Sequence, residues 1–164
     1  MIILKENIFD NHFTNFYLNM IKNKPLNTRY SGISETNYYN RYKVLGELEH
    51  EQIAIDYLND LYSVEFNIIG SWVNMVDVNS NVNDSFHYDN CDLTMITYLN
   101  DDFNGGEFEY IDEHNHITKI IPEKNLSIIN NNLLQHRVLP VSNGIRFSLV
   151  YFFNSIKKTK KTML

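Results

Sequence analysis

The sequence of 164 residues has few of the residues that mark secreted, metal-thiolate or membrane proteins. Its single cysteine, Cys91, cannot form an intramolecular disulfide, and one thiolate is too few for a zinc–thiolate cluster. No segment approaches the about 20 consecutive apolar residues that a membrane-spanning helix needs. Residues 1–6 lack the basic region and the long apolar run of a signal peptide. These absences predict a soluble, cytoplasmic protein with no membrane partner.

Positive charge is scarce over most of the chain. The net charge is −6, although four lysines are gathered near the end at Lys157, Lys158, Lys160 and Lys161. Nucleic-acid binding needs a basic surface that neutralises phosphates, so we expect no nucleic-acid partner. Residues 157–164 are predicted to form a basic tail, which is either a solvated terminus or an attachment point for an acidic partner.

Proline and glycine are also scarce, with 3 and 6 residues, and no Pro-, Gly- or Ser-rich linker divides the chain. A chain of this length suits one domain with one substantial core. We therefore predict a single domain over residues 1–156, with helical support from residues 1–65 and a β-barrel core in residues 66–156. What the chain has in quantity is aromatic residues, 11 Tyr and 10 Phe, and these favour sheets.

The spacing of apolar residues is helical in the first part of the chain. Helices are predicted at residues 10–24, where Asp10 can cap the amino end, and at residues 45–62. Between them, residues 28–40 form either a substrate flap or an ordinary surface loop.

From Phe66 onward the pattern changes to short strands separated by turn residues. The predicted strands cover residues 71–78, 85–89, 93–99, 107–111, 116–121, 126–129, 136–140 and 146–153. Asn104–Gly106 and Ser142–Gly144 supply the positive-φ positions of tight hairpins. Closely spaced short strands are typical of a sandwich or barrel. The predicted fold class is α+β, a small barrel or jelly roll with supporting helices at its amino end.

A candidate metal site begins at Ser85-Phe-His-Tyr-Asp89. In a strand, residues i and i+2 point to the same face, so His87 and Asp89 would project together. His136 is the leading candidate for a third ligand. Two histidines and one carboxylate on one face of an iron ion leave open positions for reactants.

Arg146 follows His136 by ten residues, beyond the predicted turn at Ser142–Gly144. A hairpin there would fold the second strand back beside the first and bring Arg146 to the same cavity. A buried guanidinium needs an anion, and its planar fork suits a carboxylate. Ser148, on the same face of the strand, and Tyr98 are candidates to bind the same carboxylate.

Other titratable residues are given a simpler interpretation. His114 and His116, beside Asp112 and Glu113, are predicted to lie solvated at a hairpin tip, with a second metal site as the alternative.

The ordered set of motifs resembles the 2-oxoglutarate/iron(II)-dependent dioxygenases, in particular their prolyl 4-hydroxylase-like branch. The resemblance runs from Trp72 to Phe153. The matching segments are His87-Tyr-Asp89, Thr97-Tyr-Leu-Asn100, Gly105-Gly106-Glu107, His136-Arg-Val-Leu-Pro140 and Gly144-Ile-Arg-Phe-Ser148. One position departs from the pattern, because Asp77 stands where related enzymes often have a tyrosine near the co-substrate.

The resemblance implies a double-stranded β-helix fold and a set of site roles. It makes His87, Asp89 and His136 the iron(II) ligands and Arg146 the partner of the far carboxylate of 2-oxoglutarate. It places Tyr98 and Thr94 in the co-substrate pocket. The implied reaction consumes O2, decarboxylates 2-oxoglutarate to succinate and hydroxylates an unactivated C–H bond, with ascorbate as an optional reductant.

The implied substrate is a prolyl residue in a peptide or protein, and a small molecule is the alternative. A different class of function is a non-catalytic barrel that binds a metal or a small acid as a sensor or interaction module. A zinc hydrolase with the same ligands is a third interpretation, but it lacks a nearby general base and does not explain Arg146.

Overall fold

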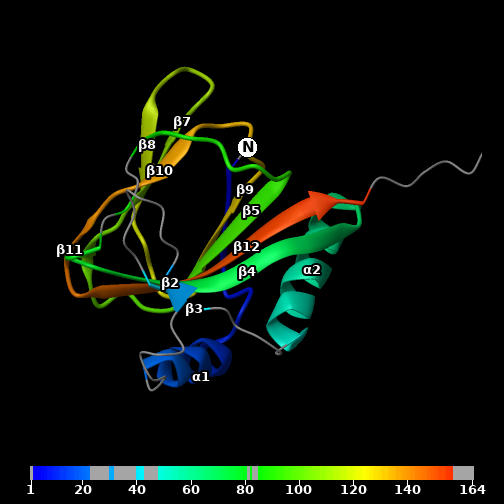
Figure 1. Ribbon diagram of the computed structural model, residues 1–164. Helices are drawn as coiled ribbons and strands as arrows, with labels where there is room; N and C mark the ends of the chain where they lie inside the picture. Colours follow the sequence, from blue (N-terminus) through cyan, green and yellow to red (C-terminus); the bar gives the residue numbers. More distant parts are fainter. Residues whose placement is uncertain are drawn as a thin grey trace, which may run out of the picture.

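The computed structural model describes residues 2–22, 30–31, 40–42, 48–80, 82 and 85–156. Their strands form two principal sheets that face each other, and two helices cover the outer face of the larger sheet (Figure 1). The predicted α+β fold, a double-stranded β-helix with helices at its amino end, is confirmed, although the two sheets do not close into a continuous hydrogen-bonded barrel. The predicted basic tail and most of the predicted flap lie outside the described residues.

The major sheet has seven strands in the order β1-β9-β5-β12-β4-β3-β2. Its two longest strands, β4 and β12, pair antiparallel at the centre. The strands are β1 (Ile2–Glu6), β2 (Tyr30–Ser31), β3 (Asn40–Tyr42), β4 (Phe66–Asp77), β5 (Leu93–Tyr98), β9 (Leu126–Asn130) and β12 (Ile145–Ser155).

The minor sheet has three strands in the order β10-β7-β8. A separate short pair, β11-β6, is formed by the segments that connect the two sheets along the chain, since β6 follows β5 and β11 precedes β12. The strands are β6 (Asn104–Gly105), β7 (Phe108–Ile111), β8 (Ile117–Ile120), β10 (His136–Val138) and β11 (Val141–Asn143). Gly105, Gly106 and Gly144 have positive φ, as predicted for these turns. A Cβ at Gly144 would approach the backbone of Asp102 and Phe103 to about 3 Å, so only glycine fits there without a shift.

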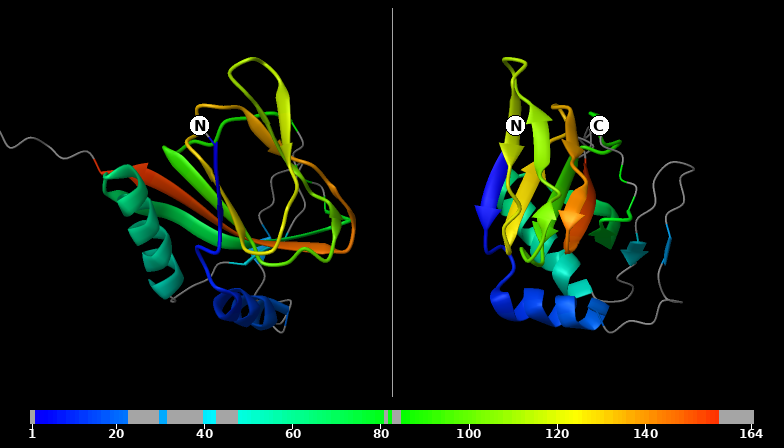
Figure 2. Two further views of the ribbon diagram at one scale, coloured as in Figure 1. Left: turned by 180° about the vertical axis from the view of Figure 1, so that it is seen from behind. Right: turned by 90° about the vertical axis from the view of Figure 1, so that its left-hand side faces the viewer.

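The helices are α1 (Asn11–Lys22) and α2 (Leu48–Tyr62). Asp10 caps α1 as predicted, because its Oδ1 accepts a hydrogen bond of 2.8 Å from the Phe13 N–H. Both helices lie on the side of β4 and β12 that faces away from β7, β8 and β10 (Figures 1 and 2). Among the described residues, no helix has the length and apolarity needed to cross a membrane.

The alternation of side chains along β12 creates two separate cores. Phe147, Leu149, Tyr151 and Phe153 pack with α1 and α2 on the outer face of the sheet. Arg146, Ser148, Val150 and Phe152 alternate with them and therefore face the minor sheet, where a second cluster of Tyr98, Phe108, Ile120, Leu126 and Ile128 lies. The outer core anchors the sheet, and the inner face is left to carry polar residues.

Two local predictions are wrong. Residues 85–89 do not form a strand, because only His87 is paired, through an isolated bridge to His136. The predicted hairpin between the strands of His136 and Arg146 is also absent. The strand β10 pairs with β7, whereas β12 pairs with β4 and β5, so the two side chains come from opposite sheets. Pairing of β11 with β6 diverts the chain from one sheet to the other.

The helix-to-sheet core predicts unequal costs for two leucines of α2. Leu58 is 0% exposed and Leu61 is 41% exposed. Leu58→Ala should lower the free energy of unfolding by about 2–5 kcal/mol, since it removes buried methyl groups and leaves a cavity. The matched control Leu61→Ala should cost about 1 kcal/mol or less. Urea unfolding followed by circular dichroism measures both, and equal losses would contradict the assignment of the outer core.

Candidate active site

A cavity of about 280 Å³ opens between the two sheets. His87, Asp89 and His136 lie around one part of its wall, and Arg146 lies in another. Ile96 and Val150, which pair across β5 and β12, contribute apolar surface to the same wall. The cavity therefore combines a cluster of potential metal ligands with one buried cation.

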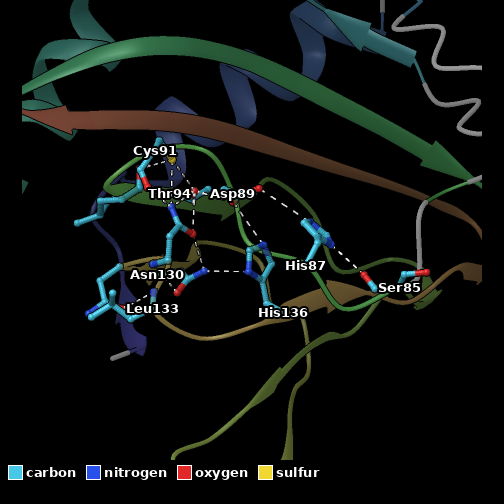
Figure 3. A network of polar contacts seen from close by, with 11 residues as sticks. Ser85, His87, Asp89, Cys91, Thr94, Asn130, Leu133 and His136 are labelled. Atoms are coloured by element: carbon cyan, nitrogen blue, oxygen red, sulfur yellow. Dashed lines mark hydrogen bonds and ion pairs between the residues drawn. The ribbon is translucent and has the colours of Figure 1, made fainter.

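The three predicted ligands converge. Each offers one ligand atom within 4.8 Å of the others, and they are the one such cluster of three or more His, Cys, Asp or Glu side chains among the described residues. Asp89 lies between the imidazoles, with Oδ2 3.4 Å from His136 Nε2 and Oδ1 3.9 Å from His87 Nε2 (Figure 3). Two imidazole nitrogens and one carboxylate on one face are a donor set that suits iron(II).

Backbone pairing brings the two histidines together. The His87 N–H donates to the His136 carbonyl, and the His136 N–H donates to the His87 carbonyl, each at 3.0 Å. Their ring centroids are 4.7 Å apart. The Nδ1 of His87 lies 2.9 Å from the Ser85 carbonyl oxygen, which can only accept, so Nδ1 carries the proton. In the neutral imidazole, Nε2 is then the nitrogen without a proton, as metal ligation requires.

Asp89 is oriented by Thr94, whose hydroxyl donates to Oδ2 at 2.7 Å. Burial raises the pKa of Asp89, but hydrogen bonds from His136 and Thr94 and the neighbouring imidazoles outweigh it and hold the pKa below its usual value. The group is therefore a carboxylate near neutral pH. Thr94 lines the cavity as predicted, and its hydroxyl is directed at Asp89.

An ion pair on the outer face of the minor sheet holds the segment that carries His87. Both Nε and a terminal nitrogen of Arg137 contact Oε2 of Glu109, at 2.8 and 2.7 Å. The guanidinium of Arg137 also lies over the ring of Phe86, 4.4 Å from its centroid. Because Phe86 precedes His87, this contact restrains the loop at the metal-ligand cluster.

Arg146 is 5% exposed, and one of its terminal nitrogens donates to the Gly106 carbonyl at 3.0 Å. Its Nε has no hydrogen-bond partner among the described residues. Desolvation lowers the pKa of Arg146, but the guanidinium is so basic that it remains charged. A buried cation with one neutral carbonyl partner is incompletely satisfied, so the cavity fits an anion at this place.

Tyr98 and Ser148 lie beside Arg146 on the inner face of the major sheet. They are paired across β5 and β12, and both are buried. The Tyr98 hydroxyl has no hydrogen-bond partner among the described residues, and burial raises the pKa of this phenol to about 12, so it is a proton donor. The structure thus brings together two hydroxyl-bearing side chains and a guanidinium, as the sequence predicted.

Sequence reasoning missed several residues of the cavity wall. Asn74, on strand β4, lines the cavity and pairs with Ser148 of β12. Its Oδ1 is buried and has no hydrogen-bond partner among the described residues. Trp72 and Phe152 pack against each other with ring centroids 4.8 Å apart and ring planes tilted by 31°, and both line the cavity. The sequence pattern that could have identified these residues is the alternation Trp72-Asn74-Val76, which puts the three side chains on one face of a correctly predicted strand.

The remaining candidates lie elsewhere. Asp77 ends β4 and accepts hydrogen bonds from Asn79 and Ser80 in a turn. The preceding residue, Val76, is the one that lines the cavity. His114 and His116 are exposed at the tip of the β7–β8 hairpin, as predicted.

Comparison with known proteins agrees with this geometry. A model of the 2OG-Fe(II) oxygenase superfamily matches residues 75–154. No curated protein sequence matches the chain. An oxidoreductase of the 2OG-Fe(II) oxygenase family from Burkholderia pseudomallei is 20% identical, with a TM-score of 0.72, over 93% of this chain and 85% of its own.

Two further solved structures contain different kinds of bound molecule. A prolyl hydroxylase from Trichoplax adhaerens, in complex with a hypoxia-inducible-factor peptide fragment, is 16% identical with a TM-score of 0.67, over 93% of this chain and 83% of its own. HygX from Streptomyces hygroscopicus, with nickel, 2-oxoglutarate and hygromycin B bound, is 9% identical with a TM-score of 0.68, over 93% of this chain and 82% of its own.

The fold and the cluster define an oxidoreductase built on a double-stranded β-helix. The chain resembles the 2OG-Fe(II) oxygenase superfamily over residues 75–154, and members of that superfamily require iron(II), 2-oxoglutarate and O2. The residues present fit these groups, because the cluster supplies two imidazoles and a carboxylate and the buried Arg146 supplies an unsatisfied cation for a dicarboxylate.

The Glu109–Arg137 pair predicts a pH-dependent contribution to stability. The hydrogen bond from Arg137 lowers the pKa of Glu109 below its ordinary value of 4.5. A carboxylate with a depressed folded-state pKa stabilises the fold above its unfolded-state pKa, and this contribution is lost as the pH falls through the folded-state value. Glu109→Gln should therefore be less stable than the wild type at pH 7 and approach its stability as the pH falls below the ordinary carboxyl value of 4.5.

Urea unfolding at several pH values measures this difference. Glu113→Gln serves as the control, because Glu113 is exposed at the hairpin tip of the same sheet. A stability difference for Glu109→Gln that does not change between pH 7 and pH 3 would contradict the role of this pair.

Proposed function

We propose that this protein is an iron(II)- and 2-oxoglutarate-dependent hydroxylase that acts on a prolyl residue of a peptide or protein. One observation carries the proposal. Two histidines and an aspartate converge on the wall of a cavity that also contains a buried, incompletely satisfied arginine. A set of three metal ligands alone fits many activities, but the buried guanidinium of Arg146 favours a bound acid.

Each ligand has a distinct supporting contact. His87, Asp89 and His136 would hold iron(II). Thr94 keeps the Asp89 carboxylate oriented, and the Ser85 carbonyl keeps the proton of His87 on Nδ1. When bound, iron(II) and 2-oxoglutarate supply the oxidising chemistry, in which O2 is consumed, 2-oxoglutarate becomes succinate and carbon dioxide, and a C–H bond becomes C–OH.

The far carboxylate of 2-oxoglutarate would lie against Arg146, with hydroxyl donors from Tyr98 and Ser148. Along β5, Ile96 stands between Thr94 at the metal cluster and Tyr98 beside Arg146, and Val150 pairs with Ile96 on β12. The wall is therefore polar at both ends and apolar in the middle, which matches a five-carbon dicarboxylate. The apolar surface also keeps water away from the middle of the cavity.

The aromatic part of the wall supports a compact aliphatic substrate. Trp72 and Phe152 form an aromatic pair on the cavity wall, and Val82 and Val138 add apolar surface. A pyrrolidine ring can pack against such a surface, and the fold is shared with a prolyl hydroxylase that binds a peptide. HygX shares the same fold and binds hygromycin B, so a small-molecule substrate is the competing proposal.

Substitution of Arg146 tests the co-substrate site. Arg146→Met should weaken 2-oxoglutarate binding by at least about 30-fold, because breaking a buried, hydrogen-bonded charge pair costs about 2 kcal/mol or more. Arg146→Lys should lose less, since it keeps the charge but not the planar fork. Anaerobic titration of 2-oxoglutarate into the iron(II)-loaded protein, followed by its absorbance, measures the affinity.

The control is Lys5→Met, which removes an exposed cation on β1. Equal affinities for Arg146→Met and the wild type would refute the assigned role of Arg146. A protein that binds metal and 2-oxoglutarate yet never releases succinate, with or without substrate, would instead be the non-catalytic metal- and acid-binding module.

The substrate class is tested by comparing matched peptides. Succinate release should rise when proline-containing peptides are added, and the peptide mass should increase by one oxygen atom. The same peptides with each proline replaced by alanine should give only the uncoupled rate. His136→Ala should abolish both rates because it removes a ligand. Stimulation by small amino compounds and not by peptides would replace the prolyl assignment with a small-molecule one.

A further inference from the structure

Two asparagines lie directly behind the metal-ligand cluster, and the proposed reaction assigns them no role. Asn130 is the last residue of β9, and Asn132 follows it in the loop that leads to His136. The side chain of Asn130 lies beside His136 (Figure 3), and that of Asn132 contacts Thr94. Asn130 is 2% exposed, so its amide must find its partners within the protein.

The contacts form a continuous path between two ligands. Asn130 Nδ2 lies 3.0 Å from His136 Nδ1 and 2.9 Å from Asn132 Oδ1. Asn132 Nδ2 donates to Thr94 Oγ1 at 3.1 Å, and Thr94 donates to Asp89 Oδ2 at 2.7 Å. His136 and Asp89, which contact each other through Nε2 and Oδ2, are therefore also joined from behind.

The proton inventory shows that the path has one consistent direction. Thr94 has a single hydroxyl proton and gives it to Asp89, so its oxygen can accept from Asn132. The Asn132 oxygen then accepts from Asn130. The second N–H of Asn130 is directed at Nδ1 of His136. In this arrangement the neutral imidazole has its proton on Nε2, beside Asp89.

Metal ligation through Nε2 requires the other tautomer of His136. The ring must then carry its proton on Nδ1, and Nδ1–H needs an acceptor. A half-turn of the Asn130 amide would put its oxygen at Nδ1 to accept this proton, in exchange for the hydrogen bonds that Asn130 now makes with the backbone N–H and Oδ1 of Asn132. No other side chain forms a hydrogen bond with Nδ1 among the described residues.

We propose that Asn130 is a positioning residue for His136, which holds the imidazole through Nδ1 and is coupled to Asp89 through Asn132 and Thr94. The inference rests on the proposed roles of His87, Asp89 and His136 as metal ligands. Asn130 touches neither metal nor substrate, so its effect should appear first in metal affinity. A partner of this kind typically changes metal affinity by about 10–100-fold.

Two substitutions of opposite hydrogen-bonding character test the proposal. Asn130→Leu is similar in size and cannot hydrogen-bond, so it should weaken Co(II) binding by about 10–100-fold. Asn130→Asp offers only acceptors, which favour the Nδ1–H tautomer, so it should bind Co(II) as tightly as the wild type or more tightly. The visible d–d absorption of Co(II), titrated into the metal-free full-length protein, gives the affinity and reports the ligand geometry.

Ser127→Ala is the matched control on the same strand. It removes a buried hydrogen bond of 2.7 Å to Thr97 and should leave Co(II) affinity unchanged. Thermal unfolding of each metal-free variant checks folding. If Asn130→Leu does not fold, Asn132→Ala takes its place. This variant breaks the same path in a partly exposed residue and should weaken Co(II) binding several-fold.

The outcomes separate the two proposals. Weaker binding by Asn130→Leu together with retained binding by Asn130→Asp supports the positioning role. Equal weakening of both variants, or no change in either, overturns it and leaves the proposed function in place. Failure of the wild-type protein to give the Co(II) signature overturns the metal site itself, and the positioning role with it.

Discussion

The site depends on one reciprocal pair of backbone hydrogen bonds, between His87 and His136. The segment around His87 is not a strand, so no sheet holds it in place. This single bridge sets the two imidazoles side by side and leaves Asp89 between them. Around the bridge, Arg137 restrains Phe86 on one side, and Thr94 orients Asp89 on the other. The ligand cluster is therefore built from local contacts on a rigid scaffold, which is the arrangement that precise metal geometry requires.

The scaffold works because β12 has a different partner on each face. Its outward side chains pack with two helices and stabilise the sheet through apolar burial. The inward side chains are thereby free to include Arg146, whose burial would otherwise be costly. Strand β12 therefore both stabilises the fold and carries the incompletely hydrogen-bonded guanidinium of Arg146. Separation of the two tasks by side-chain alternation explains how one sheet carries a hydrophobic core and a polar cavity.

The order of charged and apolar groups in the cavity gives the match to the oxygenase family model a physical meaning. A metal-ligand cluster, an aliphatic stretch and a guanidinium follow one another along the inner face of the major sheet. The proposed binding of a dicarboxylate, with one end at the metal-ligand cluster and the other at Arg146, would complement this order. The aromatic pair of Trp72 and Phe152 adds a wall whose chemistry is independent of the co-substrate and is therefore suited to recognise the second reactant.

The sequence by itself determined the elements and the chemical inventory. Period-two and helical spacing placed most strands and both helices, and the residue types at 87, 89, 136 and 146 indicated a metal and an acid. Only the tertiary structure decided how these residues meet. The predicted hairpin was wrong because β11 pairs with β6 and sends β12 into the other sheet. The positions of Asn74 on the cavity wall and of Asn130 beside His136 were likewise invisible, because an asparagine in a strand shows its partners only when distant strands lie side by side. Side-chain periodicity is local, whereas strand pairing depends on contacts between residues far apart in the chain.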